Sequence, residues 1–287
     1  MDKKDKSVAN ENRVIYTSSS RRVATDVVLT EQPLLIRLNW QTESINESKI
    51  FTITMRTIGD EKYLIMGLLL SEGVIRDIQD VVSIIQDESD DVSSLNSWEA
   101  TLSDRCIPNF ETIERFQPKY SSCGICGTTS IKSLEVKSPP KLNERKHWLS
   151  KTLIFSLSES MKKAQKLFHQ TGGSHASGCF NENGELIAIK EDIVRHNAMD
   201  KLIGELFYKE MIPVQNESLI IVLSGRISFE LVQKAVMAGI SVIIAIGSPS
   251  DLAISTAKRF NLTLIGFVTS SSFNLYHGEW RIEKEKE

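Results

Sequence analysis

The fold of this chain is decided by LIIVLSGRISFELVQKAVMAGISVIIAIGSPSDLAISTAKRFNLTLIGFV, residues 219–268. Three fully apolar runs alternate here with two segments of amphipathic helical spacing. The runs are Leu219–Leu223, Val242–Ile246 and Leu262–Val268, and the helical segments are Ser228–Ala238 and Pro249–Arg259. Apolar strands separated by amphipathic helices indicate a parallel or mixed sheet with both faces covered. We therefore expect an α/β fold in which the three strands share one sheet.

Polar loops follow each of these strands. Ser224-Gly225-Arg226 and Gly247-Ser248-Pro249-Ser250 stand between a strand and a helix, and Phe267 to Ser272 follow the third strand. Ligands of open α/β sheets bind at the carboxyl ends of the strands, where helix N-termini face phosphates. Three such loops predict a ligand that carries phosphate.

Upstream, helical spacing from Leu153 to Phe168 leads into the glycine-rich segment 171–179. Two glycines beside hydroxyls, Gly172 and Gly173, can form a backbone nest for an anion. His175 can then donate a proton or bind a phosphate. The alternative is a tight turn with a satisfied histidine.

A short strand, Leu186–Ile189, and a helix from about His196 to Lys209 follow. Between them, residues 191–201 are dense in polar groups within an apolar region. Arg195, His196, Asn197, Asp200 and Lys201 offer both charge signs and several donors. The alternative is an ordinary solvated helix start capped by Asp192.

The N-terminal part of the chain is rich in strand patterns. Alternating apolar and polar residues predict strands in 22–39 and 51–56, a strand pair in 74–86, and strand character in 98–116. A helix over 61–71, apolar on most sides, is expected to be largely buried. We expect a flexible tail over 1–20, a β-rich region over 21–118 and an α/β domain over 119–287.

The predicted α/β domain begins with the loop Ser121-Ser122-Cys123-Gly124-Ile125-Cys126-Gly127. A C-x-x-C pair ligates metal, exchanges disulfides or carries sulfur as a persulfide, in each case through the thiolate. Structural zinc needs two further ligands, and Cys106, Cys179, His169 and His175 form no second pair at finger spacing. Nucleobase deaminases use H-x-E before P-C-x-x-C, whereas His175-Ala176-Ser177 lacks the glutamate and follows the cysteines.

Composition bounds the remaining possibilities. The chain has 287 residues, 41% hydrophobic and 25% charged, which is ordinary for a soluble globular protein. A net charge of −3 does not suit a general nucleic-acid binder. No apolar run is long enough to span a bilayer, and residues 1–13 do not resemble a secretory signal. We expect a cytoplasmic protein that binds neither nucleic acid nor membrane.

An ordered set of motifs resembles the FdhD family of formate dehydrogenase accessory sulfurtransferases. The motifs run from Met55-Arg56-Thr57 and Leu70-Ser71-Glu72-Gly73 through the cysteine loop, Thr171-Gly172-Gly173-x-His175, Glu191-Asp192, Arg195-His196-Asn197-Ala198-x-Asp200-Lys201 and Ser224-Gly225-Arg226 to Gly266-Phe267 and Asn274-x-Tyr276. The resemblance implies a cytidine-deaminase-like mixed sheet with covering helices, without deaminase chemistry.

The resemblance also implies a reaction. A cysteine desulfurase loads sulfur onto Cys123 as a persulfide, with Cys126 as its partner. The sulfur then passes to the molybdenum or tungsten bis-guanine-dinucleotide pterin cofactor before that cofactor enters formate dehydrogenase. The cofactor is an acceptor, and neither a tightly bound cofactor nor a metal is expected. Its guanine dinucleotide part is held by Phe267, Val268, Thr269, Ser270, Ser271 and Ser272. Further candidate cofactor-binding residues are Gly172, Gly173, His175, Arg195, His196, Ser224 and Arg226.

Two positions depart from the family pattern. Val194 stands where the family usually has glycine, and residues 269–272 lack the basic residue often found there. Two other functions stay open: a chaperone that holds the cofactor without chemistry, and a zinc hydrolase of deaminase type. We also expect a homodimer, because the apolar helix 61–71 and Trp40 suggest surplus apolar surface.

Overall fold

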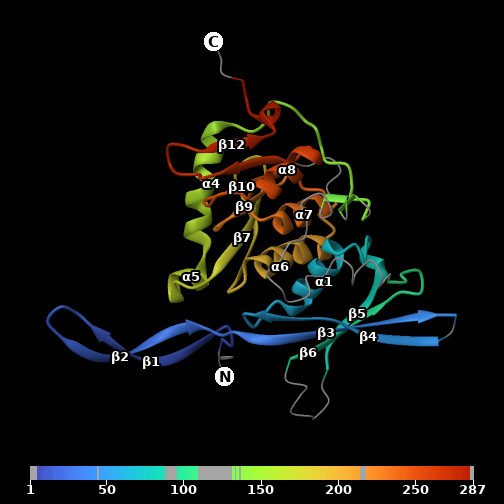
Figure 1. Cartoon of the computed structure of the whole chain (residues 1–287), viewed down its shortest axis with the longest axis horizontal. Coiled ribbons are helices and arrows are strands. Elements are labelled where there is room, and N and C mark those ends of the chain that lie inside the picture. Colours follow the sequence, from blue (N-terminus) through green and yellow to red (C-terminus); the bar gives the residue numbers. More distant parts are fainter. Residues whose placement is uncertain are drawn as a thin grey trace.

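The computed structural model describes residues 5–43, 45–87, 96–108, 131–132, 134–135, 137–213 and 218–284. The cysteine loop with Cys123 and Cys126, the predicted boundary at 118/119 and the later part of the predicted strand 98–116 lie outside the described residues. Figure 1 shows a helix-covered sheet standing on a long, flat ribbon of strands.

The helix-covered sheet has six strands in the order β12-β11-β10-β9-β7-β8. They are β7 (His175–Phe180), β8 (Leu186–Asp192), β9 (Ile220–Leu223), β10 (Val242–Ala245), β11 (Thr263–Gly266) and β12 (Asn274–His277). Strands β9, β10 and β11 are parallel neighbours, whereas β7, β8 and β12 pair antiparallel. The predicted mixed α/β fold, with these three strands in one sheet, is confirmed.

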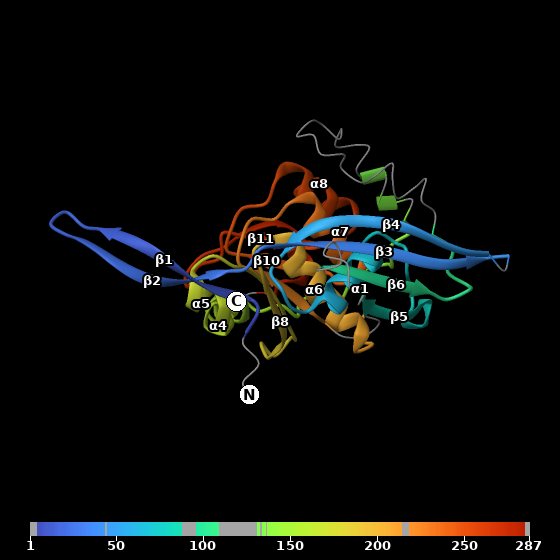
Figure 2. The same ribbon diagram turned by 90° about the horizontal axis from the view of Figure 1, so that it is seen from below.

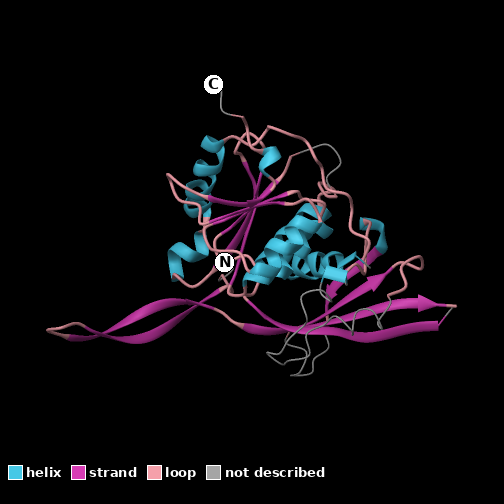
Figure 3. Ribbon diagram, turned by 45° about the horizontal axis from the view of Figure 1, so that its top comes forward, coloured by secondary structure: helices cyan, strands magenta, loops and turns pink. Residues whose placement is uncertain are grey.

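Helices cover both faces of this sheet (Figures 1 and 3). One face carries α4 (Lys151–Ala164), continued by the short α5 (Lys166–Thr171), and the other carries α6 (Arg195–Tyr208), α7 (Phe229–Met237) and α8 (Asp251–Arg259). Alternate residues of each strand point to opposite faces. Val222 and Ile244 therefore join the cluster around α4, while Ile221 and Ile243 join the larger cluster with α6 and α7.

The ribbon consists of two further sheets. The four-stranded sheet has the order β4-β3-β6-β5, with β3 (Gln32–Thr42), β4 (Ile45–Arg56), β5 (Val81–Gln86) and β6 (Ser97–Leu102). The two-stranded sheet pairs β1 (Val8–Tyr16) with β2 (Arg21–Leu29). Helix α1 (Glu61–Ser71) has the predicted bounds and is largely buried, and the short helices Ile78–Asp80 and Glu279–Arg281 complete the described elements.

Residues 8–16 form a strand, although the sequence assigned them to a tail. β1 pairs residue by residue with β2, from Val8 opposite Leu29 to Tyr16 opposite Arg21. The polar run of Asn10 to Arg13 breaks the hydrophobic pattern that marks a strand. Residues 8–16 form a strand because they pair with β2, and this pairing is not visible in the sequence pattern.

Three further expectations differ from the structure. The glycine-rich segment contains strand β7, whose small residues let α4 approach: a Cβ on Gly178 would lie 2.8 Å from Met161 Sδ. The segment 74–86 holds one strand after a short helix rather than a strand pair. Trp40 is partly buried against the main core, so it no longer supports a dimer surface.

Helices α1 and α6 touch through their backbones and join the two large sheets. A Cβ on Gly67 would lie 1.9 Å from the carbonyl oxygen of Asp200, and one on Gly204 would lie 1.8 Å from that of Tyr63. No side chain fits at either position. Glycine at both sites is therefore a requirement of the helix contact rather than of a turn.

Two buried ion pairs lie at the same joint. Lys201 Nζ lies 2.8 Å from Asp192 Oδ2 and donates to Thr57 O at 2.9 Å. Lys234 donates to both oxygens of Asp200, at 2.7 and 2.9 Å. Burial raises the pKa of Asp192, and Lys201 with two backbone amides opposes that rise. Breaking such a pair is costly because it leaves a buried charge without a partner.

Replacing Gly204 by alanine is expected to destabilise the protein by about 2 kcal/mol. Overpacking destabilises a protein by about 1–3 kcal/mol, and we expect a value near the upper limit because the added Cβ collides with a backbone carbonyl rather than with a side chain. This loss exceeds the gain of about 1 kcal/mol that alanine has over glycine in a helix. Urea unfolding measures the difference. Gly173→Ala is the matched control, since its Cβ would meet only side-chain atoms at 3.6 and 3.9 Å. Equal stability of Gly204→Ala and wild type would contradict the backbone contact.

Candidate functional site

The start of β7 and the loops after β9, β10 and β11 meet at one edge of the six-stranded sheet, because β7 runs antiparallel to β9. Ala176 N donates to Ser224 Oγ at 2.8 Å, and Ser224 N donates to Ala176 O at 3.0 Å. Gly247 N donates to Gly225 O, and Phe267 N to Gly247 O, both at 3.2 Å. Backbone hydrogen bonds therefore tie the predicted loops into one continuous rim, as the carboxyl ends of parallel strands require.

Glycine allows the neighbouring loops of this rim to approach each other closely. A Cβ on Gly247 would lie 2.7 Å from Gly225 O and 2.8 Å from Arg226 N. A Cβ on Gly225 would lie 3.3 Å from His175 Nδ1. The imidazole of His175 thus packs directly against the loop that follows β9, and two segments far apart in the sequence share one wall.

Cationic side chains gather around His175. Burial lowers the pKa of His175, and the nearby charges of Arg195, His196 and Arg226 lower it further, with Asp192 opposing. Within the described residues, Arg195 Nε is buried with no hydrogen-bond partner. A histidine kept neutral among cations, beside an arginine with an unused donor, is suited to an anionic ligand. The structure therefore brings His175, Arg195, His196, Ser224 and Arg226 together.

His196 has two neighbours that the sequence did not single out. Its Nε2 lies 3.1 Å from Ser228 Oγ and 3.0 Å from Glu230 Oε2. The hydrogen bond with His196 lowers the pKa of Glu230. Both contacts use the same ring nitrogen, whereas a serine–histidine–acid relay uses one nitrogen for each partner. The group therefore holds the His196 ring in place and is not a hydrolytic triad. No spacing rule joins Ser228 or Glu230 to His196, so the sequence does not single them out.

The six residues at 267–272 divide into different environments. Phe267 has φ +54° and a ring that is 48% exposed, while Val268 is buried and its amide donates to Ala245 O at 3.1 Å. Thr269 Oγ1 accepts from Ser271 N and Ser272 N and lies 3.0 Å from Ser272 Oγ. The Thr269 hydroxyl is therefore occupied by hydrogen bonds within the turn, while the Ser270 and Ser271 side chains are exposed.

Gly172 and Gly173 form a tight turn. Gly172 ends α5 with φ +68° and donates to Phe168 O at 2.7 Å. Gly173 N donates to Thr171 Oγ1 at 3.2 Å. Because both amides already have acceptors, the geometry matches the alternative of a turn rather than an open anion nest.

The polar stretch 191–201 serves mostly the fold. Asp192, Asn197, Asp200 and Lys201 are buried at the joint between the sheets, and the solvated helix start considered as an alternative is wrong for them. Arg195 and His196, by contrast, lie near enough to His175 for their charges to act on it. Val194, where the resemblance leads us to expect glycine, has φ −105°, so the valine side chain imposes no backbone strain.

Two of the four cysteines lie within the described residues, and both are buried. Cys106 Sγ contacts Val74 O at 3.1 Å, and burial raises its pKa to about 11. Burial raises the pKa of Cys179 to about 12. Thiolates are the reactive form. Neither thiol is suited to sulfur chemistry at neutral pH.

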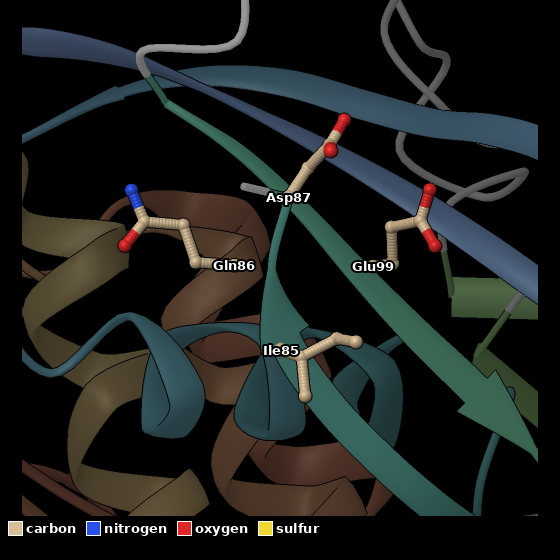
Figure 4. A pocket seen from close by; sticks show the side chains of 4 residues that line it. All are labelled: Ile85, Gln86, Asp87 and Glu99. Atoms are coloured by element: carbon tan, nitrogen blue, oxygen red, sulfur yellow. The ribbon is translucent and has the colours of Figure 1, made fainter. Parts of the chain in front are cut away.

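Other features of the described part of the chain add no second centre of this kind. A shallow hollow lined by Ile85, Gln86, Asp87 and Glu99 lies on the four-stranded sheet (Figure 4). No three His, Cys, Asp or Glu side chains group to hold a metal ion among the described residues. No described helix is both long and apolar enough to cross a bilayer.

Sequence comparison gives a consistent result. Residues 29–283 match the FdhD/NarQ family. The chain is 39% identical over 279 residues to "Sulfur carrier protein FdhD" of Streptomyces avermitilis, covering 95% of each chain. It is 37% identical over 265 residues to the protein of that name in Sulfurisphaera tokodaii, covering 92% of this chain and 95% of the relative. The Mycobacterium tuberculosis protein is 35% identical over 277 residues, with 91% and 97% covered.

Structural comparison agrees at the level of the fold. A crystal structure described as a putative formate dehydrogenase accessory protein from Desulfotalea psychrophila superposes with a TM-score of 0.71. It is 20% identical, with 96% of this chain and 99% of the other covered. With a family match across most of its length and relatives above 30% identity that are named sulfur carrier proteins, the chain belongs to the FdhD/NarQ family.

Proposed function

We propose that the protein takes sulfur from a cysteine desulfurase onto Cys123 and delivers it to the bis-guanine-dinucleotide cofactor destined for formate dehydrogenase. The Cys123 thiolate attacks the outer sulfur of the desulfurase persulfide, which frees the desulfurase thiolate and leaves a persulfide on Cys123. Attack by the Cys126 thiolate on the inner sulfur of this persulfide then passes hydrosulfide to the cofactor and leaves a Cys123–Cys126 disulfide, which a thiol reductant must reduce before the next cycle.

The observation that carries this proposal is the distribution of thiols. The chain has four cysteines, and Cys106 and Cys179 are buried with raised pKa values. A sulfur carrier needs a thiolate that an acceptor can reach. The burial of the other two thiols therefore supports the glycine-framed pair, Cys123 and Cys126, as the site of the proposed chemistry.

The cationic rim supports the second half of the proposal. The acceptor carries phosphates, and His175, Arg195 and Arg226 lie together with an unused donor on Arg195. The exposed ring of Phe267 on the same rim offers a stacking surface for guanine. We propose that this rim holds the nucleotide part of the cofactor, in a cytoplasmic protein.

Two alternatives remain distinct in their outcomes. A chaperone without chemistry uses the same cationic rim but needs no persulfide. A zinc hydrolase needs a metal, and purified protein without zinc that still activates the dehydrogenase eliminates it.

Cys123→Ala is expected to abolish formate dehydrogenase activation without loss of stability. Cys126→Ala should reduce activation but still accept sulfur on Cys123. Mass spectrometry after incubation with a desulfurase and cysteine should show one added sulfur, about 32 Da, on Cys123.

Cys106→Ser is the matched control, because serine can keep the hydrogen bond to Val74 O that Cys106 makes. This variant should load and deliver sulfur as wild type does. A Cys123→Ala variant that still activates the dehydrogenase, with label on Cys126, reverses the assignment. Activation without any label supports the chaperone.

Binding of guanosine diphosphate, the probe for the nucleotide part, is expected to weaken as pH rises from about 6 to 8. His175 has a lowered pKa in the free protein. An anion bound at the rim raises the pKa of His175, so binding is accompanied by uptake of a proton. Affinity therefore falls as pH rises from the pKa of His175 in the free protein to its pKa in the complex. Calorimetry in two buffers of different ionisation enthalpy measures the proton uptake.

His175→Gln is the comparison that isolates this residue, since the diphosphate itself also titrates. The variant should bind with a smaller pH dependence and less proton uptake. An unchanged pH profile in His175→Gln places the phosphate away from His175.

A further inference from the structure

Glu191, the last residue but one of β8, uses both of its carboxylate oxygens within the protein. Its Oε2 accepts from Leu167 N at 2.8 Å, and its Oε1 accepts from Phe168 N at 2.8 Å and from Ser174 Oγ at 2.7 Å. Hydrogen bonds to an ionised group are roughly twice as strong as those between neutral groups. One carboxylate therefore joins two segments that lie on either side of the glycine turn, residues 172–173.

Two of these hydrogen bonds cap α5. A helix leaves its first N–H groups without acceptors inside the helix, and the residue just before the helix usually supplies one. Gln165, the residue before α5, makes no such side-chain hydrogen bond. Glu191 supplies it from a strand instead, and its negative charge is favourable at this end of a helix. The hydrogen bond from Ser174 has no part in this capping and needs a separate explanation.

The alternation of side chains along the paired strands gives that explanation. In the β7–β8 pairing, His175 lies opposite Asp192 and Ala176 lies opposite Glu191. His175 and Asp192 therefore share the face that carries α6, while Glu191 and Ser174 are on the face that carries α5. A hydrogen bond on one face of the sheet thus holds the residue next to His175, whose imidazole is on the other face.

His175 needs this support because it lies at the end of a strand. It is the first residue of β7, and the ladder between β7 and β9 begins at Ser177, opposite Leu223. The ends of secondary-structure elements open more readily than their middles. The hydrogen bond from Ser174 to Glu191 fixes the backbone immediately before this end.

The turn that leads into β7 is also packed from the side of the β1–β2 hairpin. Helix α5 lies beside the base of that hairpin (Figures 1 and 2). A Cβ on Gly173 would lie 3.6 Å from Cδ1 of Leu29, the last residue of β2. The segment before His175 is therefore held by an apolar contact with the hairpin and by a charge-assisted hydrogen bond with Glu191.

We propose that Glu191 is a positioning residue for the rim: through Ser174 it holds His175 where the imidazole meets a phosphate of the acceptor. The inference rests on the proposed function, because it takes the rim as the nucleotide site. A side chain that binds an anion must be held within about 0.5 Å of its productive position, and supporting hydrogen bonds provide this precision. Glu191 itself touches no ligand.

Calorimetric titration of the full chain with guanosine diphosphate tests the proposal. Ser174→Ala removes the hydrogen bond to Glu191 but leaves the carboxylate in place to cap α5, and circular dichroism checks that the variant folds. At a pH of about 6, this variant should bind about tenfold more weakly than wild type. It should also take up fewer protons on binding, because the displaced imidazole no longer meets the phosphate.

A double-mutant cycle with His175→Gln separates positioning from a general structural role. If Ser174 acts through His175, adding Ser174→Ala to His175→Gln changes the affinity by less than about twofold, since no imidazole is left to position. If the serine hydroxyl serves only the fold, the two substitutions weaken binding independently and their effects multiply.

Two substitutions of Glu191 provide a graded comparison. Glutamine keeps an oxygen that can accept from Ser174, so Glu191→Gln should bind guanosine diphosphate more tightly than Glu191→Ala. Ser158→Ala is the matched control, because the Ser158 hydroxyl donates to Phe155 O at 3.2 Å within α4, on the same face of the sheet. This control should bind the nucleotide and take up protons as wild type does.

The outcomes distinguish this inference from the proposed function. Wild-type binding by Ser174→Ala, independent effects in the cycle, or no advantage of Glu191→Gln over Glu191→Ala overturns the positioning role. The rim assignment then still stands if His175→Gln weakens binding or reduces its pH dependence. A wild type that binds no guanosine diphosphate, or a His175→Gln variant that behaves as wild type, overturns the rim assignment and the positioning role together.

Discussion

The backbone contact between α1 and α6 is the constraint on which the rest of the structure depends. Gly67 and Gly204 allow the two helices to touch where any side chain would collide with a carbonyl oxygen. This closeness lets Lys201 of α6 reach Thr57 O just before α1, and lets Ser71 of α1 donate to Asp200 at 3.2 Å. The joint fixes the four-stranded sheet against the six-stranded one.

The same joint orients the candidate site. Asp192 ends β8 and is held by Lys201, and its Oδ1 accepts from Val194 N at 2.8 Å. The first turn of α6, with Arg195 and His196, is thereby directed to the rim beside His175. Polar residues of one short stretch thus have two tasks. The buried residues Asp192 and Lys201 set the direction of the helix, and Arg195 and His196 provide charge at the rim.

The proposed chemistry separates two demands on the protein. A sulfur carrier requires accessible thiols, whereas a large anionic acceptor requires a rigid cationic surface. The rim meets the second demand with hydrogen-bonded loops on a buried sheet, and the burial of Cys106 and Cys179 keeps competing thiols out of reach.

The sequence by itself determined the α/β layer, because fully apolar strands and amphipathic helices leave few other ways to bury their surface. It also placed Ser224, Arg226 and Phe267 at strand ends, which parallel strands bring to one edge. Tertiary structure alone decided that residues 8–16 are a strand, since their pattern is polar and only pairing with β2 orders them. It also decided that Asp192, Asp200 and Lys201 are structural. The sequence alone does not show whether a charged residue is exposed to solvent or forms a buried ion pair.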